Sequence, residues 1–301
     1  MPRRYVTIDV FTDRAFGGNP LAVVLDAEGL STARMQAIAR EFNYSETTFV
    51  LPPADPANTA QVRIFTPSFE MPFAGHPNVG TALVLAARAA TPRARVVFEE
   101  IAGFVPIEIQ HRGGRPVAAE LTAPRLLSRG GNADPAKVAA AVGLDASDIL
   151  LGAHRPTMAT VGAPFLFAEL ASRAALGHAS GEPARLATLL AASETVGLFL
   201  YTFDGADAAR DVHARMFFLA HGVVEDPATG SAAVAFAALR ASLAPAADLV
   251  LSLRVSQGED MGRPSLLATR AVKQAGRVVS AHVGGGGVEM MTGTLADLGA
   301  D

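Results

Sequence analysis

The pattern of apolar and polar positions predicts short strands and two apolar helices. Residues 61–65 and 213–217 alternate in character, which is typical of strands with one buried face. Downstream of each lies an alanine-rich segment, 78–90 and 229–243, that is apolar nearly all round. A helix without a polar face is buried on most sides. The simplest arrangement is therefore a mostly antiparallel sheet curled round a central buried helix, formed twice in an α+β fold.

The two halves of the chain also resemble each other in sequence. The turn and apolar run at 18–25 is similar to 162–170, with prolines 144 positions apart (164 − 20). Likewise 76–82, His-Pro-Asn-Val-Gly-Thr-Ala, is similar to 226–232, Asp-Pro-Ala-Thr-Gly-Ser-Ala, with prolines 150 positions apart (227 − 77). Two features in the same order and at nearly the same spacing indicate a duplication, which predicts two pseudo-symmetric halves.

The boundary between the halves is expected near residue 122. Residues 112–116, Arg-Gly-Gly-Arg-Pro, are typical of a hairpin turn, and the proline-containing stretch 122–135 is typical of a linker. The sequence thus predicts an N-terminal half over 1–122 and a C-terminal half over 123–301, with the segment from about residue 288 packing back onto the first half.

Composition and charge exclude several classes of protein. The 301 residues are 50% hydrophobic and 18% charged, which argues against long disordered stretches. The formal charge of −4 gives no electrostatic reason to bind nucleic acid. No apolar run approaches the ~18 residues that span a bilayer, and Asp9 and Asp13 interrupt any signal-peptide core. We expect a cytoplasmic protein with neither nucleic-acid nor membrane partners.

The chain has no cysteine, which removes disulfides, thiolate nucleophiles and cysteine-ligated metals. Its seven histidines, at positions 76, 111, 154, 178, 213, 221 and 282, show no spacing typical of metal ligands. We therefore expect no metal site and no other cofactor.

The prolines of the repeat predict where the two apolar helices begin. Proline is favoured at the first helical position, so Pro77 and Pro227 place His76 and Asp226 at the N-caps. Aspartate is a good cap, and the simplest interpretation of Asp226 is structural. Histidine is a poor cap, so His76 has either a functional role or a buried structural one.

Small and hydroxyl-bearing residues gather at these helix starts. Helix N-termini present unsatisfied N–H groups and attract carboxylates and other anions. If the halves face each other, two helix starts converge on one cleft that holds a small anionic substrate. The residues predicted to bind it are Ser45, Gly75, Gly80, Thr81, Thr229 and Gly230.

Three stretches are similar to well-known functional motifs but lack a residue or a structural context that each motif requires. The stretch 75–81 lacks the lysine of a phosphate-binding loop. Ser231 is not in a Gly-x-Ser-x-Gly turn, so a hydrolase triad with His76 and Asp226 has little support. The glycines at 284–287 lack the strand–turn–helix context of a dinucleotide-binding loop, and they predict a flexible turn.

Glu46 is the remaining candidate for acid–base chemistry. A helical pattern ends at Phe42 and a strand pattern begins at Phe49, so Glu46 stands at a junction among aromatic residues. Apolar surroundings disfavour the charged form of a carboxyl and raise its pKa toward neutrality, where it can move protons. The alternative is a solvated or capping glutamate.

Four ordered motifs give the chain its resemblance to a known family. Residues 9–20, Asp-Val-Phe-Thr through Gly-Gly-Asn-Pro, then 43–47, Asn-Tyr-Ser-Glu-Thr, then 75–77, Gly-His-Pro, and 226–232 resemble the successive signatures of PhzF-like proteins. The likeness continues through Gln257-Gly258 to Gly262-Arg263-Pro264-Ser265, and so covers essentially the whole chain.

The resemblance implies a diaminopimelate-epimerase-type fold with the active site in a cleft between two halves. In the phenazine enzyme of this family a glutamate moves a proton between two carbons of dihydro-hydroxyanthranilate, assisted by a histidine, an aspartate and a serine. By motif position these catalytic roles fall on Glu46, His76, Asp226 and Ser231. The resemblance also implies a homodimer. Related racemases use one cysteine from each half, and a chain without cysteine cannot use that chemistry.

The expected function is a cofactor-independent isomerase that moves a proton between carbons of a small carboxylate. Glu46 would be the acid/base, while His76 and Asp226 position the substrate and tune proton transfer. Ser231 and the helix N-termini would hold the carboxylate. Two alternatives stay open, a small-molecule binding protein without turnover and a hydratase or lyase of related chemistry.

Overall fold

The computed structural model describes residues 2–220 and 223–296, without the side chains at positions 220, 223 and 224. His221 therefore lies outside the described residues. The same is true of parts of the expected halves, 1–122 and 123–301. Strands dominate and helices are few, which confirms the α+β class. The chain divides into two units, residues 1–122 with 284–301, and residues 123–283.

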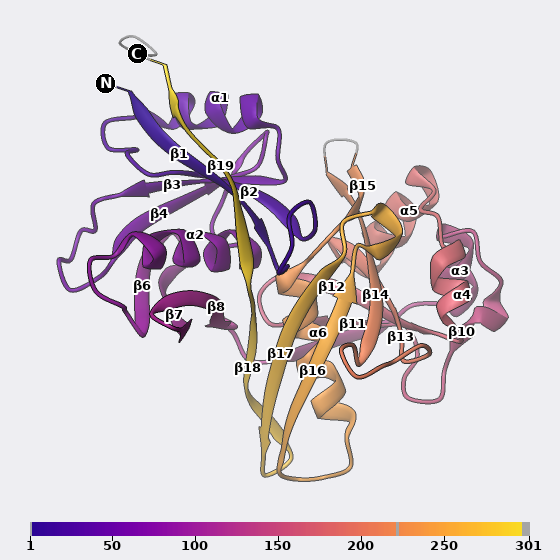
Figure 1. Ribbon diagram of the computed structural model, residues 1–301. Helices are drawn as coiled ribbons and strands as arrows, with labels where there is room; N and C mark the ends of the chain where they lie inside the picture. Colours follow the sequence, from indigo (N-terminus) through magenta and orange to yellow (C-terminus); the bar gives the residue numbers. More distant parts are fainter. Residues whose placement is uncertain (1, 221–222, 297–301) are drawn as a thin grey trace. The chain divides into compact units, whose positions relative to one another are not determined.

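The first unit is a sheet with two helices (Figure 1). Its strands run in the order β19, β1, β2, β3, β4, β6, β7, β8, and only the pairs β2–β3 and β4–β6 are parallel. The short β5 pairs with β4. The elements are β1 (Arg3–Val10), β2 (Asn19–Val24), α1 (Thr32–Phe42), β3 (Glu46–Leu51), β4 (Ala60–Phe65), β5 (Glu70–Met71), α2 (Gly75–Arg88), β6 (Arg95–Glu100), β7 (Gly103–Arg112), β8 (Arg115–Thr122) and β19 (Gly287–Leu295).

The two helices of this unit pack on different strand faces. Val24 of β2 and Phe49 of β3 form a cluster with Met35 and Ile38 of α1. The helix α2 contacts β1, β2, β3, β7, β8 and β19, so strands from both ends of the order touch it. All but three of its fourteen residues are buried, because it has no polar face.

The second unit places helices on both faces of its sheet. Pairing links β9, β11, β12, β13, β14, β16 and β17 in this order, with β12–β13 and β14–β16 parallel. Strand β15 pairs with β14, and β10 with β12. The elements are β9 (Ser128–Asn132), α3 (Pro135–Ala141), η1 (Ala146–Asp148), β10 (Ile149–Leu150), β11 (Thr157–Thr160), β12 (Pro164–Leu170), α4 (Arg173–His178), α5 (Pro183–Ser193), β13 (Gly197–Thr202), β14 (Val212–Ala220), β15 (Val223–Asp226), α6 (Gly230–Leu243), β16 (Leu249–Gln257), η2 (Glu259–Met261), β17 (Ser265–Gln274) and β18 (Arg277–Gly285).

Strand β13 shows why this sheet has two covered faces. Leu198 and Leu200 point into a cluster with leucines of α4 and α5. The alternate residues Phe199 and Tyr201 point the other way, with ring centroids 5.6 and 4.6 Å from that of Phe236 in α6. Side chains alternate across a strand, so a strand covered on both faces is buried at every position, as β13 is.

Two local predictions are wrong. The stretch 122–135 is not only a linker, because Ser128–Asn132 forms β9 and pairs with β11. The glycines at 284–287 form no turn but continue from β18 into β19. They are needed for close approach: a Cβ on Gly284 would lie 2.5 Å from the carbonyl oxygen of Ala119.

No helix within residues 2–220 and 223–296 combines the length and apolarity needed to cross a membrane.

Candidate active site

Glu46 is positioned by the end of α1 and the start of β3. Asn43 adopts a left-handed conformation (φ 53°) that ends the helix, and asparagine tolerates it better than most residues. The chain then enters β3 at Glu46, whose backbone lies opposite Leu21 in the parallel pairing with β2. The Glu46 side chain is 15% exposed. The junction predicted from the sequence therefore exists, and it holds a largely buried carboxyl.

His76 is the second residue of α2 and not its N-cap. The helix begins at Gly75 with Ala74 as the cap, and no side chain caps it. The prediction failed because proline is tolerated throughout the first turn, where its missing N–H has no helical partner to lose. Pro77 is thus the third helical residue, and His76 projects from the first turn with only 5% exposure.

The structure brings Glu46 and His76 together. The Nε2 atom of His76 lies 3.5 Å from Oε2 of Glu46. Burial lowers the pKa of His76 to about 3, because the charged imidazolium is disfavoured away from water. The histidine is therefore neutral near pH 7. A neutral imidazole can accept a hydrogen bond from a protonated carboxyl or donate one to a carboxylate, so it suits both states of an acid/base.

Gly80 and Thr81 lie in the second turn of α2 and face the interior of the first unit. A Cβ on Gly80 would come within 2.7 Å of side-chain carbons of Leu21 and Val10. The hydroxyl of Thr81 hydrogen bonds that of Thr48 on β3 at 2.8 Å. Packing against Leu21 and Val10 thus accounts for the small size of Gly80, and the hydrogen bond with Thr48 accounts for the hydroxyl of Thr81. Neither explanation requires contact with a substrate.

Asp226 is the last residue of β15, three positions before the cap of α6. The helix begins at Gly230 with Thr229 as its cap, so the prediction that Asp226 caps it is wrong. Instead, the Thr229 hydroxyl donates a 2.5 Å hydrogen bond to Oδ2 of Asp226. The cause is the pairing of Asp226 with Met216 in the sheet, which holds its backbone in extended conformation. Asp226 is 7% exposed.

The other predicted site residues lie close in sequence to these two groups. Ser45 is half-buried and directly precedes Glu46, and Gly75 is the buried first residue of α2. Gly230 and the half-buried Ser231 are the first two residues of α6. The first unit thus joins Glu46 to His76, and the second joins Asp226 to Thr229 beside the start of α6.

Gln257 holds the Asp226 segment, and the sequence analysis gave it no role. It is fully buried at the end of β16, where Nε2 donates to the carbonyl oxygen of Asp226 at 2.8 Å and to the Thr229 hydroxyl at 3.1 Å. Its Oε1 accepts from the Thr229 N–H at 3.2 Å. The available signal was the Gln257-Gly258 pair within the family resemblance, because a side-chain amide that becomes buried needs hydrogen-bond partners, which backbone groups can supply.

Glu100 is a second residue that the sequence analysis missed. Both of its carboxyl oxygens are buried at the end of β6. Burial raises its pKa to about 8, and the neighbouring Asn78 side chain lowers it only in part. Asn78 lies in the first turn of α2 and donates from Nδ2 to the carbonyl oxygen of Ala74 at 3.0 Å. A neutral carboxyl therefore lies beside the turn that carries His76.

A pocket of the first unit is a separate feature. It measures about 820 Å³ and is lined by residues of β1, β3 and the end of α2, including Leu85, Arg88 and Ala89. Leu85 lies nine residues beyond His76, about 14 Å along the helix axis. Neither Glu46 nor His76 lines it, so the chemistry of this pair does not depend on the pocket.

In the described part of the chain, no group of three or more His, Asp or Glu side chains is arranged to hold a metal ion.

The fold places the chain in a known structural class. It is similar to a solved PhzF-family protein from Bacillus anthracis, with a TM-score of 0.89 and 23% identity, covering 99% of this chain and 100% of that chain. It is also similar to a hydroxyproline epimerase from Agrobacterium vitis, with a TM-score of 0.59 and 16% identity over 98% of this chain and 91% of that one. This is the α+β fold shared by PhzF-family proteins and such epimerases.

Sequence then identifies the family. The family described as phenazine biosynthesis-like protein matches residues 8–293. An uncharacterized isomerase of Mesorhizobium japonicum is 39% identical, over 97% of this chain and 98% of that protein. The trans-2,3-dihydro-3-hydroxyanthranilate isomerase of Pseudomonas aeruginosa is 38% identical, over 96% of this chain and 98% of that protein. The chain belongs to the phenazine biosynthesis-like family, which confirms the resemblance found in the sequence.

Proposed function

We propose that this chain is a cofactor-independent isomerase that moves a proton between two carbons of a small carboxylate. The observation that carries the proposal is the largely buried Glu46 carboxyl 3.5 Å from a neutral His76. A carboxyl in this setting can take a proton from one carbon, keep it while the substrate's electrons rearrange, and return it to another. The isomerase names of relatives at 38% and 39% identity support the same class of reaction.

The predicted residues other than Gly80 and Thr81, which have packing roles, take part in this scheme as follows. Glu46 is the acid/base, and the neutral His76 ring, 3.5 Å away, can accept a hydrogen bond from its protonated form or donate one to its carboxylate form. Asp226 and Ser231 bind polar groups of the same substrate, and N–H groups of the first turns at Gly75 and Gly230 hold its carboxylate. The proposal includes Ser45 and Thr229 as binding residues next to the two carboxyls.

A first candidate substrate is trans-2,3-dihydro-3-hydroxyanthranilate, because it is the substrate in the name of the P. aeruginosa relative. Incubation with this compound and with other small carboxylates, followed by mass spectrometry and NMR, tests the function. An isomerase gives a product of unchanged mass and altered C–H positions. A product that has gained or lost one water indicates a hydratase or lyase, and binding without conversion indicates a binding protein.

The enzyme alternative is favoured over simple binding by the Glu46–His76 pair. A carboxyl buried to 15% exposure costs stability unless it is compensated, and a site that only binds an anion has no use for a negative charge there. The chemistry of the pair is that of proton transfer.

Asp226→Asn tests whether Asp226 takes part in the reaction. Asparagine keeps an oxygen that accepts from Thr229, so the fold is expected to persist. The rate is expected to fall about tenfold or more, since the loss of ~1.4 kcal/mol of transition-state stabilisation has this effect. Steady-state kinetics and thermal unfolding measure both. Asp248→Asn, at an exposed aspartate of the same unit, is the control. An unchanged rate in Asp226→Asn would limit Asp226 to its contact with Thr229.

Exhaustive removal of metals should leave kcat unchanged. The proposed proton transfer uses only carboxyl and imidazole groups, and the chain has no cysteine to bind a metal or to be alkylated. Dialysis against chelators followed by kinetics checks this. Lost activity that one defined metal restores would show that a metal takes part.

We also propose that the two halves arose by duplication. The middle strand β2 pairs antiparallel with β1 and parallel with β3, and β12 pairs in the same way with β11 and β13. The apolar helices α2 and α6 follow in each half.

We further propose that the protein is a homodimer in the cytoplasm.

A further inference from the structure

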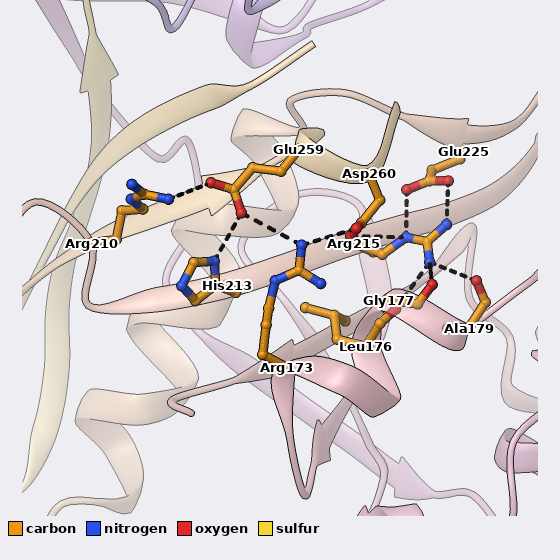
Figure 2. Close-up of polar contacts among 10 residues, drawn as sticks. All are labelled: Arg173, Leu176, Gly177, Ala179, Arg210, His213, Arg215, Glu225, Glu259 and Asp260. Carbon is orange, nitrogen blue, oxygen red and sulfur yellow. Dashed lines mark hydrogen bonds and ion pairs between the residues drawn. The ribbon is translucent and has the colours of Figure 1, made fainter. Parts of the chain in front are cut away.

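A cluster of charged side chains in the second unit has no part in the proposed proton transfer (Figure 2). It combines residues from α4, from β14 and the loop before it, from β15 and from the η2 turn. We call it the Glu259 network. Its members are Arg173, Arg210, His213, Arg215, Glu225, Glu259 and Asp260.

Glu259 is the centre of the network. Its Oε1 accepts a 2.6 Å hydrogen bond from Nη1 of Arg210, and its Oε2 lies 3.0 Å from Nδ1 of His213. The same Oε2 is 3.7 Å from Nη2 of Arg173. The carboxylate is 24% exposed, so its contacts with two guanidinium groups and the His213 ring are partly shielded from water. They fix the η2 turn against β14 and the start of α4.

The surroundings of His213 call for a doubly protonated ring. Nδ1 faces the Glu259 carboxylate at 3.0 Å, and Nε2 faces the carbonyl oxygen of Gly205, also at 3.0 Å. Both partners are acceptors. A neutral imidazole has one N–H and would leave one nitrogen lone pair against an oxygen, whereas an imidazolium donates to both. His213 is 6% exposed, so water cannot easily replace either contact.

Charged groups of both signs lie around the His213 ring. The charged groups near the ring are Glu259, which contacts it, Arg173 and Arg210, which contact Glu259, and Asp207, which lies 3.3 Å from Arg210. Arg215, two residues along the same strand face, is neutralised by a bidentate pair with Glu225 at 2.8 and 2.7 Å.

The network connects directly to the Asp226 segment. Glu259 directly follows Gly258, which has a positive φ of 76°. Gly258 is also closely packed, because a Cβ at this position would lie 2.6 Å from the carbonyl oxygen of Pro227. Gln257, one residue earlier, holds Asp226 and Thr229 through its side-chain amide. A shift of the η2 turn therefore moves both contacts with this segment.

We propose that His213 is a proton-dependent positioning residue. As an imidazolium it ties the Gly205 loop to Glu259 and thereby fixes Gln257 and the segment from Asp226 to Thr229. Rising pH removes one ring proton, one of the two hydrogen bonds is lost, and the segment loosens. The link to catalysis rests on the proposed function, because it requires Asp226 to belong to the site. The coupling itself does not.

NMR of the full-length wild-type protein across a pH titration tests the coupling without any substrate. Ring ¹⁵N shifts of His213 report its protonation, while the Gln257 side-chain amide and the Thr229 backbone amide report the segment. We expect an imidazolium at low pH, and as the ring loses its proton both amides should shift with the same midpoint. A ring that is neutral wherever the protein is folded would overturn the proposal, as would amides that do not follow it.

Two variants sharpen the result. His213→Gln keeps polarity but cannot titrate, and it should abolish the coupled shift of both amides. His178→Gln, at an exposed histidine of the same unit, should leave it unchanged. If turnover is found, the corresponding high-pH decline of kcat should disappear in His213→Gln. An absence of turnover contradicts the proposed function and leaves the NMR test decisive. If His213→Gln does not fold, the wild-type titration still decides.

Discussion

Replacing Glu46 with glutamine is expected to lower kcat at least ~10²-fold, the lower end of general acid–base contributions. Glutamine keeps the size of glutamate and can still hydrogen bond His76, so the fold should persist. It cannot accept and return a proton. Binding of a carboxylate ligand should therefore change little while the rate falls, and steady-state kinetics with calorimetric binding separates the two.

Glu41→Gln is the matched control for this variant. Glu41 is an exposed residue of α1 a few positions upstream, and its replacement should change neither kcat nor binding. A Glu46→Gln protein with the wild-type rate would remove Glu46 from the mechanism. A variant that loses both ligand binding and rate would assign Glu46 to substrate binding instead.

Replacing Glu100 with glutamine is expected to remove a large pH dependence of stability. Burial raises the pKa of Glu100 from 4.5 to about 8 in the folded protein. Between these values the unfolded chain loses the proton and the folded protein keeps it, so stability falls as pH rises from about 4.5 to 8. The loss is on the order of a few kcal/mol, because one pKa unit corresponds to about 1.4 kcal/mol.

Denaturant unfolding at several pH values measures this effect. Glutamine is neutral throughout, so Glu100→Gln should match the wild type at acidic pH and become more stable than it at alkaline pH. Glu108→Gln, on the adjacent β7 with a side chain 61% exposed, should keep the wild-type pH slope. Equal slopes in wild type and Glu100→Gln would show that the Glu100 carboxyl ionises normally in the fold.

Periodicity predicted the main elements because each depends on nearby residues. The alternation at 61–65 and 213–217 became strands of the two units, and the apolar segments became α2 and α6. The turn at 112–116 joins β7 to β8 as its glycines indicate. A pattern that is repeated over one element needs no information from the rest of the chain.

The ends of helices and strands, and the places where two backbone segments pack closely, were less predictable from the sequence. Pro77 fits any position of the first helical turn, so it could not locate the start of α2. Asp226 pairs with Met216 of the neighbouring strand, and this sheet pairing overrides its preference for a cap. The glycines at 284–287 have the sequence of a turn, but proximity to the Ala119 backbone requires them.

The sequence predicts the candidate functional residues that belong to motifs. It does not predict the residues that hold these motifs in place. Glu46 and His76 were found separately, and the fold supplies their 3.5 Å contact. Gln257 acts on Asp226 from 31 residues away, and Glu259 acts on His213 from 46 residues away. Such polar contacts depend on strand register, which no local pattern specifies.

Turnover in deuterium oxide tests whether Glu46 carries one proton between two carbons of the substrate. The substrate is trans-2,3-dihydro-3-hydroxyanthranilate, or the carboxylate found to be converted. Wild-type protein should place deuterium at the newly protonated carbon, incompletely where the proton stays on Glu46 throughout the transfer. Glu46→Gln should give neither product nor deuterium. Product that carries deuterium and forms at the wild-type rate in Glu46→Gln would contradict the account.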